Sequence, residues 1–414
     1  MSERKHGKAK TIVAKLVLIL FGIFLGVSIA EIALRIAGYS YPDFFMLDEA
    51  RGYALRPGME GWFRKEGESY VRINSDGLRD RQHTKAKPEN TLRIAVLGDS
   101  YAEALQVPME QAFWAVMEGE VRGCGLFAGK EIEVLNFGVS GYGTAQELIT
   151  LRDHVWDYSP DIVLLAVTTS NDITDNSLQL RRRVQAPYFF YRDGVLILDE
   201  SFKNSKGFNL RQSIIGRAGD WLSNHLRVVQ AVQESLRGLR ILFLSWRSQS
   251  ENHFQPPQWP STRKADIVAK SVELGTDNVV YLEPANPVWN DAWRVTEGLI
   301  VAMRDEVGAR GAKLVVVTLS NGPQVLPERH AREAFMKRLV IDDLFYPDNR
   351  IKDLCVNERI PVITLAPDMQ DYAEKSKVFL HGFGSDIGNG HWNAVGHRVA
   401  GQLIARKLCE GVAK

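Results

Sequence analysis

Five short, almost wholly apolar runs constrain the fold of this chain more than any other feature. They are rich in Val, Ile and Leu, and they occupy residues 92–98, 131–138, 161–167, 312–320 and 360–366. Helical patterns such as EQAFWAVMEGEV and TAQELITLRDHVW lie between them. Strands that are apolar on both faces and alternate with helices form a parallel sheet that is covered on each side. The sequence therefore predicts an α/β fold, a three-layer α/β/α sandwich with a parallel sheet.

The spacing of these runs predicts an insertion. About 145 residues separate the third run from the fourth, more than a crossover between parallel strands needs. We expect an insertion or lid at about residues 177–295. Its patterns are a hairpin at YFFYRDGVLILD, a helix over 210–236 that ends before Gly238, a strand at RILFLSWR and an irregular loop at HFQPPQWPSTRK. Turn signals around ESYVRIN predict a small β-rich lead-in over 39–90, which leaves 91–414 as the main domain.

The N-terminal segment is basic and then apolar. Residues 16–30 carry no charge, and the apolar stretch that we place at 12–38 is long enough to span a bilayer. Lys and Arg on its N-terminal side predict that residues 1–11 stay in the cytoplasm and that the remaining domain is extracytoplasmic, either periplasmic or extracellular. A signal peptide cleaved after Ser28-Ile29-Ala30 and a buried core helix are the alternatives.

The charge balance after the anchor excludes one class of partner. The first fifteen residues hold five basic side chains against one acidic, which leaves 46 basic and 49 acidic residues and a net charge of −3. We therefore expect no nucleic-acid partner. The cysteines at 124, 355 and 409 form no CxxC pair, so we expect neither a disulfide framework nor a zinc ribbon. They are expected to be buried fillers, with one bridge left open.

Polar groups follow the first three apolar runs, where the carboxyl ends of parallel strands gather ligands. Gly98-Asp99-Ser100 ends the first run, Gly141 follows the second, and Asn171 follows the third. The N–H of a glycine, the amide of an asparagine and the N–H of the serine form a donor set for the oxyanion of a tetrahedral intermediate. A turn or a helix cap, with Asp99 or Ser100 as N-cap, is the ordinary interpretation of each group taken singly.

A nucleophilic serine also needs a base. His391 lies in GNGHWNAVGHRVAGQLIA, directly before a closing helix whose predicted N-cap is Asn393. This places His391 on a loop and His397 inside the helix, where a structural role is expected. No two histidines have the spacing of a zinc helix, so we expect no metal and no cofactor.

Taken in order, Gly98-Asp99-Ser100, Gly141 in VSGYG, Asn171 in SND and His391 in GHWN resemble the four blocks of the SGNH (GDSL-type) serine hydrolase superfamily. The resemblance covers about residues 90–410, apart from the insertion. It implies the flavodoxin-like fold of that family, Ser100 as nucleophile, His391 as general base, and an oxyanion hole of Ser100, Gly141 and Asn171. The implied substrates are esters and thioesters.

Two departures from the family pattern affect the site. Thr169 stands where the third block usually has glycine, and Gly388 stands where an aspartate usually precedes the histidine by three residues. A carboxylate on the far imidazole nitrogen fixes the tautomer and stabilises the imidazolium. We predict that Asp386 supplies it, with Asn389 or a backbone carbonyl as alternatives.

The sequence thus predicts a membrane-anchored serine esterase that acts on acyl esters, with an acylated glycan or a lipid as candidate substrate. The first alternative is an O-acyltransferase for an exported or cell-envelope polysaccharide, since a sugar hydroxyl can replace water at the acyl-enzyme. The second is a non-catalytic envelope protein that binds glycans. Its candidate stacking residues are Trp246, Trp259, Trp289 and Trp293. The basic run at 181–183 is expected to be a solvated surface rather than a lipid contact.

Overall fold

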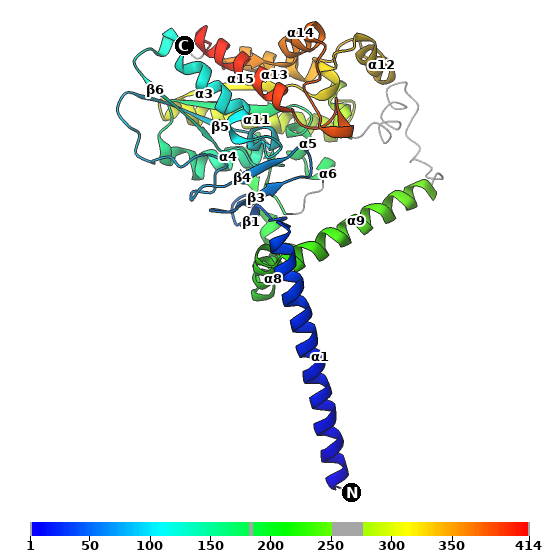
Figure 1. The fold of residues 1–414 in the computed structure, drawn as a ribbon. Helices are drawn as coiled ribbons and strands as arrows, with labels where there is room; N and C mark the ends of the chain where they lie inside the picture. Colours follow the sequence, from blue (N-terminus) through cyan, green and yellow to red (C-terminus); the bar gives the residue numbers. More distant parts are fainter. Residues whose placement is uncertain (1, 182–184, 251–275, 413–414) are drawn as a thin grey trace. The chain divides into compact units, whose positions relative to one another are not determined.

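The computed structural model describes residues 2–181, 185–250 and 276–412, and its chain divides into two compact units. The larger unit comprises Phe44–Leu210 and Pro256–Lys414 and contains the sheet (Figure 1). The smaller unit comprises Met1–Asp43 and Arg211–Gln255 and is helical.

A five-stranded parallel sheet forms the centre of the larger unit, which confirms the predicted fold class. The five predicted runs supply its strands, in the spatial order β11-β10-β7-β5-β6. Their bounds are β5 (Thr91–Leu97), β6 (Glu131–Asn136), β7 (Ile162–Thr168), β10 (Lys313–Leu319) and β11 (Val362–Thr364). The chain order reverses between β5 and β7, so these two strands flank the switch point where open α/β sheets bind ligands.

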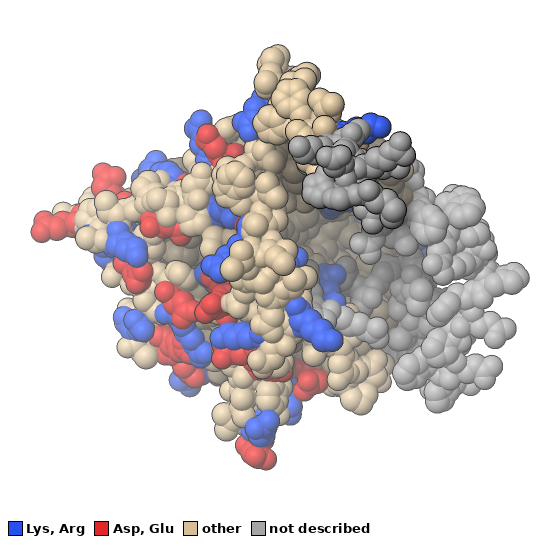
Figure 2. Space-filling model, turned by 90° about the horizontal axis from the view of Figure 1, so that it is seen from below, with Lys and Arg blue, Asp and Glu red and all other residues tan. Residues whose placement is uncertain are grey.

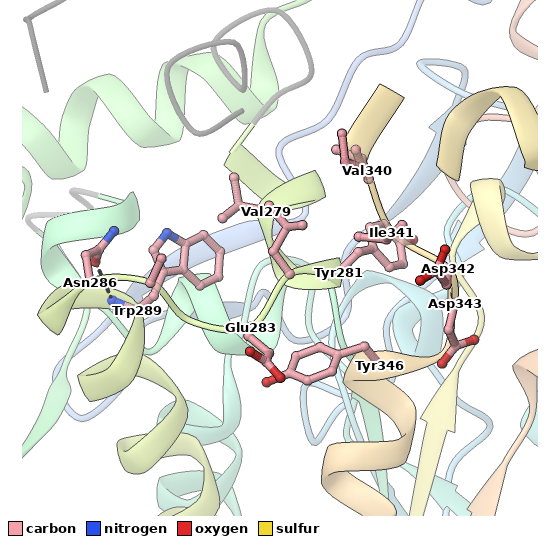
Figure 3. A pocket seen from close by; sticks show the side chains of 13 residues that line it. Val279, Tyr281, Glu283, Asn286, Trp289, Val340, Ile341, Asp342, Asp343 and Tyr346 are labelled. Carbon is pink, nitrogen blue, oxygen red and sulfur yellow. Dashed lines mark hydrogen bonds between the residues drawn. The ribbon is translucent and has the colours of Figure 1, made fainter. Parts of the chain in front are cut away.

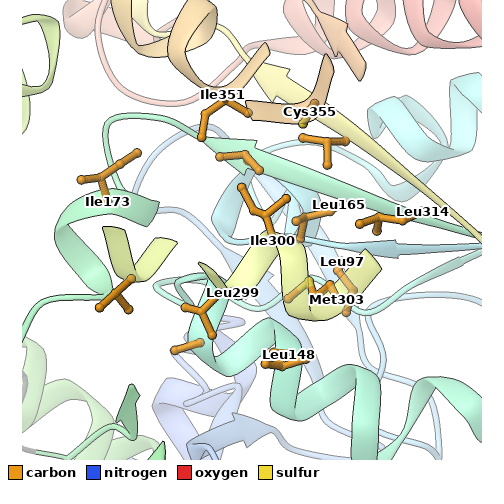
Figure 4. Packing of buried hydrophobic residues seen from close by; sticks show 14 of the residues in the cluster. Leu97, Leu148, Leu165, Ile173, Leu299, Ile300, Met303, Leu314, Ile351 and Cys355 are labelled. Carbon is orange, nitrogen blue, oxygen red and sulfur yellow. The ribbon is translucent and has the colours of Figure 1, made fainter. Parts of the chain in front are cut away.

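Helices cover both faces of the sheet. Every residue of the central strands β5 and β7 is therefore buried. Side chains of β5 alternate between two separate cores, with Leu97 in one and Val96 in the other. Figure 4 shows the first core, where Leu165 of β7 lies among Leu148, Leu299 and other residues of the covering helices. Helices on this face are α4 (Thr144–Asp153), α11 (Pro287–Ala309), α12 (Arg329–Leu339) and α13 (Tyr346–Asn357). Those on the other face are α3 (Phe113–Arg122), α14 (Ala366–Ser376) and α15 (Ala394–Cys409).

Small antiparallel pairs precede and interrupt the sheet. The predicted β-rich lead-in contains two of them, and the predicted hairpin in the insertion forms the third. The pairs are β1 (Phe45–Asp48) with β2 (Gly52–Leu55), β3 (Glu60–Phe63) with β4 (Ser69–Arg72), and β8 (Tyr188–Arg192) with β9 (Val195–Asp199). The short helices α5 (Asp172–Asp175), α6 (Leu178–Arg181) and α7 (Lys206–Gln212) follow β7 and the hairpin.

The helical unit contains α1 (Ser2–Ile36), α8 (Ile214–His225) and α9 (Arg227–Ser250). Within α1, the most apolar 18-residue window of Val13–Ile36 has a mean hydropathy of 2.5, and none of this window is buried, which disagrees with the core-helix alternative. This segment is long and apolar enough to cross a membrane, and a signal sequence would meet the same criterion.

Two predictions about the insertion are wrong. The single helix expected over 210–236 is divided at Ser213 and again at Leu226, and its last part continues through Gly238 and through RILFLSWR, where a strand was predicted. A short apolar run does not by itself distinguish a strand from a helix, and an interior glycine costs a helix only about 1 kcal/mol. The loop predicted at HFQPPQWPSTRK lies outside the described residues, as do Arg182 and Arg183.

The bridge that the sequence left open is formed between Cys124 and Cys409. It joins the end of α15 to the segment after α3, the helix against which α15 packs. Cys355 is buried as expected, and burial raises the pKa of its thiol to about 12, so the thiol is unreactive.

On the face drawn in Figure 2, Lys and Arg side chains are interspersed with Asp and Glu.

Candidate functional site

Ser100 lies at the carboxyl end of β5, on the first turn of the short helix α2 (Ser100–Glu103). The turn from strand to helix is tight, since a Cβ on Gly98 would lie 2.9 Å from the Cβ of Ala102. Asp99 is the N-cap, and its carboxylate accepts a hydrogen bond of 3.0 Å from the N–H of Tyr101. Of the two residues that the sequence offered as N-cap, Asp99 and Ser100, Asp99 caps the helix. Ser100 keeps 8% of its surface exposed.

The Asp99 carboxylate also joins the ends of β5 and β7. It accepts hydrogen bonds from Thr168 Oγ1 at 3.0 Å and from Asn171 Nδ2 at 2.8 Å. Arg181 Nη2 donates to Asn171 Oδ1 at 3.3 Å, so both ends of the amide are held. A primary amide has two N–H groups, and Asp99 accepts from one of them. The second N–H of Asn171 can serve a ligand.

The loop after β6 is held against α2. Val139 N donates to Gly98 O at 3.1 Å, and Ser140 N donates to Glu103 Oε2 at 2.7 Å. Glycine is required at 138, because a Cβ there would lie 2.4 Å from the Cβ of Ala102. Gly141 follows with φ of 77°, a conformation that favours glycine. These contacts hold the residues directly before Gly141 against the turn that contains Ser100.

His391 contacts Ser100 directly. Its Nε2 is 2.7 Å from Ser100 Oγ, although 291 residues separate the two. On the other side of the ring, Nδ1 is 2.5 Å from Glu66 Oε2. This arrangement fits a ring whose Nδ1–H donates to the carboxylate and whose Nε2 accepts the serine proton. Ser100, His391 and Glu66 thus form a continuous chain of hydrogen bonds.

Glu66 comes from the turn between β3 and β4, in the lead-in. Its Oε1 accepts the backbone N–H of His391 at 2.8 Å, so the carboxylate holds both ring and backbone. A Cβ on Gly390 would lie 2.3 Å from Glu66 Oε1, and the φ of Gly390 is 73°, so a side chain there would displace the carboxylate. Burial raises the pKa of Glu66, but the hydrogen bonds from His391 outweigh it and keep the pKa below its usual value.

Asp386 is not the residue at Nδ1 of His391. It is exposed, at the end of a short 3-10 helix (Gly384–Asp386), and its backbone carbonyl accepts from Asn389 N. The position that we predicted for Asp386, with Asn389 as an alternative, is occupied by Glu66. Sequence reasoning missed Glu66 because a glutamate in a distant hairpin turn has no local signature. The available signal was negative: no aspartate stands at position 388.

Buried polar groups support the loop before His391. His381 Nδ1 lies 2.8 Å from Gly390 O, and its Nε2 lies 3.1 Å from Ser320 Oγ, which also accepts from Trp392 Nε1 at 2.9 Å. Burial lowers the pKa of His381 to about 4, so the ring is neutral near pH 7. A neutral ring donates through Nδ1 and accepts through Nε2, which satisfies both contacts. The expected structural role of His397 fits its burial and the 3.3 Å bond from Phe113 N to its Nδ1.

A mostly apolar pocket of about 490 Å³ lies elsewhere in the larger unit, between η5 (Thr276–Tyr281), α11 and α13. Figure 3 shows Trp289, Val279 and Ile341 lining it, with Glu283 beside Tyr346. Ser100, His391 and Glu66 do not line this pocket. This pocket is therefore separate from the candidate site.

The residues proposed for glycan stacking are not on the surface where the structure describes them. Trp289 and Trp293 belong to α11 and are buried in the core. The side chain of Trp246 and all of Trp259 lie outside the described residues. Among the described residues, no group of three or more His, Cys, Asp or Glu side chains is arranged to hold a metal ion.

No protein-family model and no curated protein match the chain. Solved structures that align with it include an acetyl xylan esterase (13% identity, covering 78% of this chain and 100% of that one, TM-score 0.37). Others are an acetylxylan esterase from Geobacillus stearothermophilus (9%, 78% and 97%, 0.36) and a lipolytic protein of the G-D-S-L family from Desulfitobacterium hafniense DCB-2 (10%, 76% and 99%, 0.34). At these identities and TM-scores, the structural similarity does not establish an activity for this chain.

Proposed function

We propose that the chain is a serine esterase of the SGNH type that hydrolyses carboxylic esters. The observation that carries the proposal is the chain of contacts from Ser100 Oγ to His391 Nε2 at 2.7 Å and from His391 Nδ1 to Glu66 at 2.5 Å. A hydroxyl is nearly inert at its own pKa, and a base with an orienting carboxylate makes it nucleophilic. Ser100, His391 and Glu66 have this arrangement.

In the proposed reaction, Ser100 Oγ attacks the ester carbonyl carbon while its proton passes to His391 Nε2. The C–O bond to the leaving alcohol then breaks, and the imidazolium returns the proton to the alcohol oxygen. Water attacks the acyl-enzyme with His391 again accepting a proton, which releases the acid and restores Ser100. Glu66 stays ionised and stabilises the imidazolium in both steps, since its pKa lies below the usual value.

The oxyanion donors in this proposal are the backbone N–H groups of Ser100 and Gly141 and the free N–H of Asn171 Nδ2. Hydrogen bonds that hold these donors in place support the proposal. Asp99 and Arg181 bond to the Asn171 amide, and Glu103 accepts from the backbone N–H of Ser140, directly before Gly141. Donors fixed before the reaction cost no reorganisation when charge develops on the carbonyl oxygen.

We also propose that Val13–Ile36 anchors the enzyme in a membrane, with the basic N-terminus in the cytoplasm and the sheet domain outside. The length and hydropathy of the helix support anchoring, and the basic residues before it support this orientation. The bond between Cys124 and Cys409 fits an oxidising compartment.

The decisive experiment compares Ser100→Ala with the wild type on a chromogenic acetate ester and on a fluorophosphonate probe, which labels activated serines. We expect the variant to lose both turnover and labelling while its melting temperature is unchanged. Ser75→Ala is the matched control, because Ser75 is exposed and, among the residues that the structure describes, its hydroxyl bonds to Gln82 alone. Turnover that survives in Ser100→Ala would refute the nucleophile.

A further inference from the structure

Helix α8 has an exposed apolar face. Four large apolar side chains on it are 40–80% exposed: Ile214, Ile215, Trp221 and Leu222. They recur with the period of a helix and therefore form one continuous stripe. Such a stripe on a helix normally packs against a core, and α8 has no buried residue.

The polar side of the same helix is already occupied. Asn224 Oδ1 accepts the N–H of Asp43 at 3.1 Å, and Ser223 Oγ accepts from Gln233 Nε2 of α9 at 2.8 Å. The buried Gln230 of α9 donates to the carbonyl of Ser223 at 3.0 Å. These contacts fix which side of α8 faces the rest of its unit, so the apolar stripe is directed away from it.

The corner between α8 and α9 is bonded to the last turns of α1. Glu31 Oε2 accepts the N–H of Val228 at 3.0 Å at the start of α9, where a helix has unpaired N–H groups. Arg35 Nη2 donates to the carbonyl of His225, the last residue of α8, at 2.7 Å. Tyr41 N donates to Gln230 Oε1 at 2.9 Å. These three hydrogen bonds, one to the last residue of α8 and two to α9, hold the corner between α8 and α9 beside the end of α1 and the residues that follow it.

The position of this corner along α1 corresponds to a membrane surface. The uncharged stretch 16–30 directly precedes Glu31, and Val13 to Ala30, with Lys15 close to its far end, measures about 27 Å in a helix. The hydrocarbon core of a bilayer is about 30 Å thick. When Val13–Ile36 spans the bilayer, Glu31 and Arg35 therefore lie at the headgroup level, and α8 lies there with them.

We propose that α8 is an interfacial helix that lies on the outer leaflet of the same membrane and inserts Ile214, Ile215, Trp221 and Leu222 below the headgroups. This inference rests on the proposed anchoring by α1. Amphipathic helices with Trp and aliphatic residues on one face bind in this way, and tryptophan favours the interface. The occupant of the stripe is lipid rather than a second copy of the chain, because the contacts to Glu31 and Arg35 already hold α8 beside the end of a spanning helix.

The test uses the full chain in phosphatidylcholine vesicles, with an environment-sensitive fluorophore on one introduced cysteine. Among the native cysteines, two are bonded to each other and Cys355 is buried, so the new thiol reacts selectively. Labels go on Ile215→Cys in the stripe, on Asp220→Cys on the polar side, and on Leu20→Cys in the spanning segment. Lipids brominated on the upper part of the acyl chain act as quenchers.

We expect brominated lipid to quench the labels at 215 and 20 and to leave the label at 220 bright. Quenching at 20 without quenching at 215 would overturn the interfacial helix and leave the anchor intact. No quenching at 20 would refute the anchoring and the inference with it. A label at 215 that is shielded from water and not quenched by lipid would show that a second protein copy covers the stripe. Leu222→Cys repeats the test at a second position of the stripe.

Discussion

Replacing Glu66 with glutamine tests the electrostatic part of the proposed site. The carboxylate lies 2.5 Å from Nδ1 of His391, which puts the two charge centres about 4 Å apart when the ring is protonated, worth about 4 kcal/mol at an effective dielectric constant of 20. Both side chains keep about a quarter of their surface exposed, at 28% and 26%, and solvent weakens the pair. We take about 3 kcal/mol as the loss in the transition state, or about a 100-fold fall in kcat/KM.

The assay is steady-state hydrolysis of a chromogenic acetate ester by the full chain, and Asp386→Asn is the matched control. Asp386 is exposed and is not bonded to His391, so its variant is expected to stay within about twofold of the wild type. Glu66→Gln should stay folded, since glutamine has the same shape and can still accept from the backbone N–H of His391. An equal loss in both variants, or full activity in Glu66→Gln, would refute the assignment of the orienting carboxylate.

Three further predictions concern the surroundings of Ser100 and the fold. Asn171→Ala should lower kcat by roughly 10²- to 10³-fold with a smaller change in KM, and an unchanged kcat in steady-state kinetics would exclude it from the oxyanion hole. Burial raises the pKa of Glu103 from 4.5 to about 8. Between pH 4.5 and 8 the native state therefore keeps a proton on Glu103 that the unfolded state has released, and the free energy of unfolding falls as pH rises through this range. Glu103→Gln should remove this part of the pH dependence in urea unfolding at pH 5 and 8, and an unaltered slope would contradict it. Replacing Cys124 and Cys409 with serine should lower the free energy of unfolding by about 2–5 kcal/mol in a denaturant titration, and equal stability of both proteins would contradict a structural bridge.

The sheet was predictable because its signal is local and repeated. Each strand is a run of Val, Ile and Leu that must be buried on both faces, and the alternation with helices leaves few arrangements of the layers. Residues that follow the strands directly, such as Ser100 and Asn171, could be placed at one edge for the same reason. His391 could be placed on a loop because Asn393 is a recognisable N-cap, and the structure confirms that cap.

The secondary structure of the insertion was harder to predict from the sequence, because the same apolar residues are compatible with a strand or a helix. RILFLSWR is apolar enough for a buried strand, but it continues a helix whose earlier turns are already formed, and extending a helix costs less than starting a new element. Gly238 predicts a helix end only where its backbone turns left-handed, and here the backbone stays helical, so α9 continues through it.

The orienting carboxylate shows why the lead-in belongs to the site and is not only a connection to it. The hairpin that contains Glu66 is followed by Arg79, whose buried guanidinium donates to the carbonyl of Val107 at 2.6 Å. Asp80 accepts the N–H of Asn136 at 2.9 Å, at the end of β6. A chain that began at residue 91 would retain the serine and the histidine, but it would lose the carboxylate and leave that N–H of β6 without its partner. The spatial requirement at Nδ1 of His391 is met by a residue that is remote in sequence, because the lead-in packs against the same edge of the sheet at which the strands end.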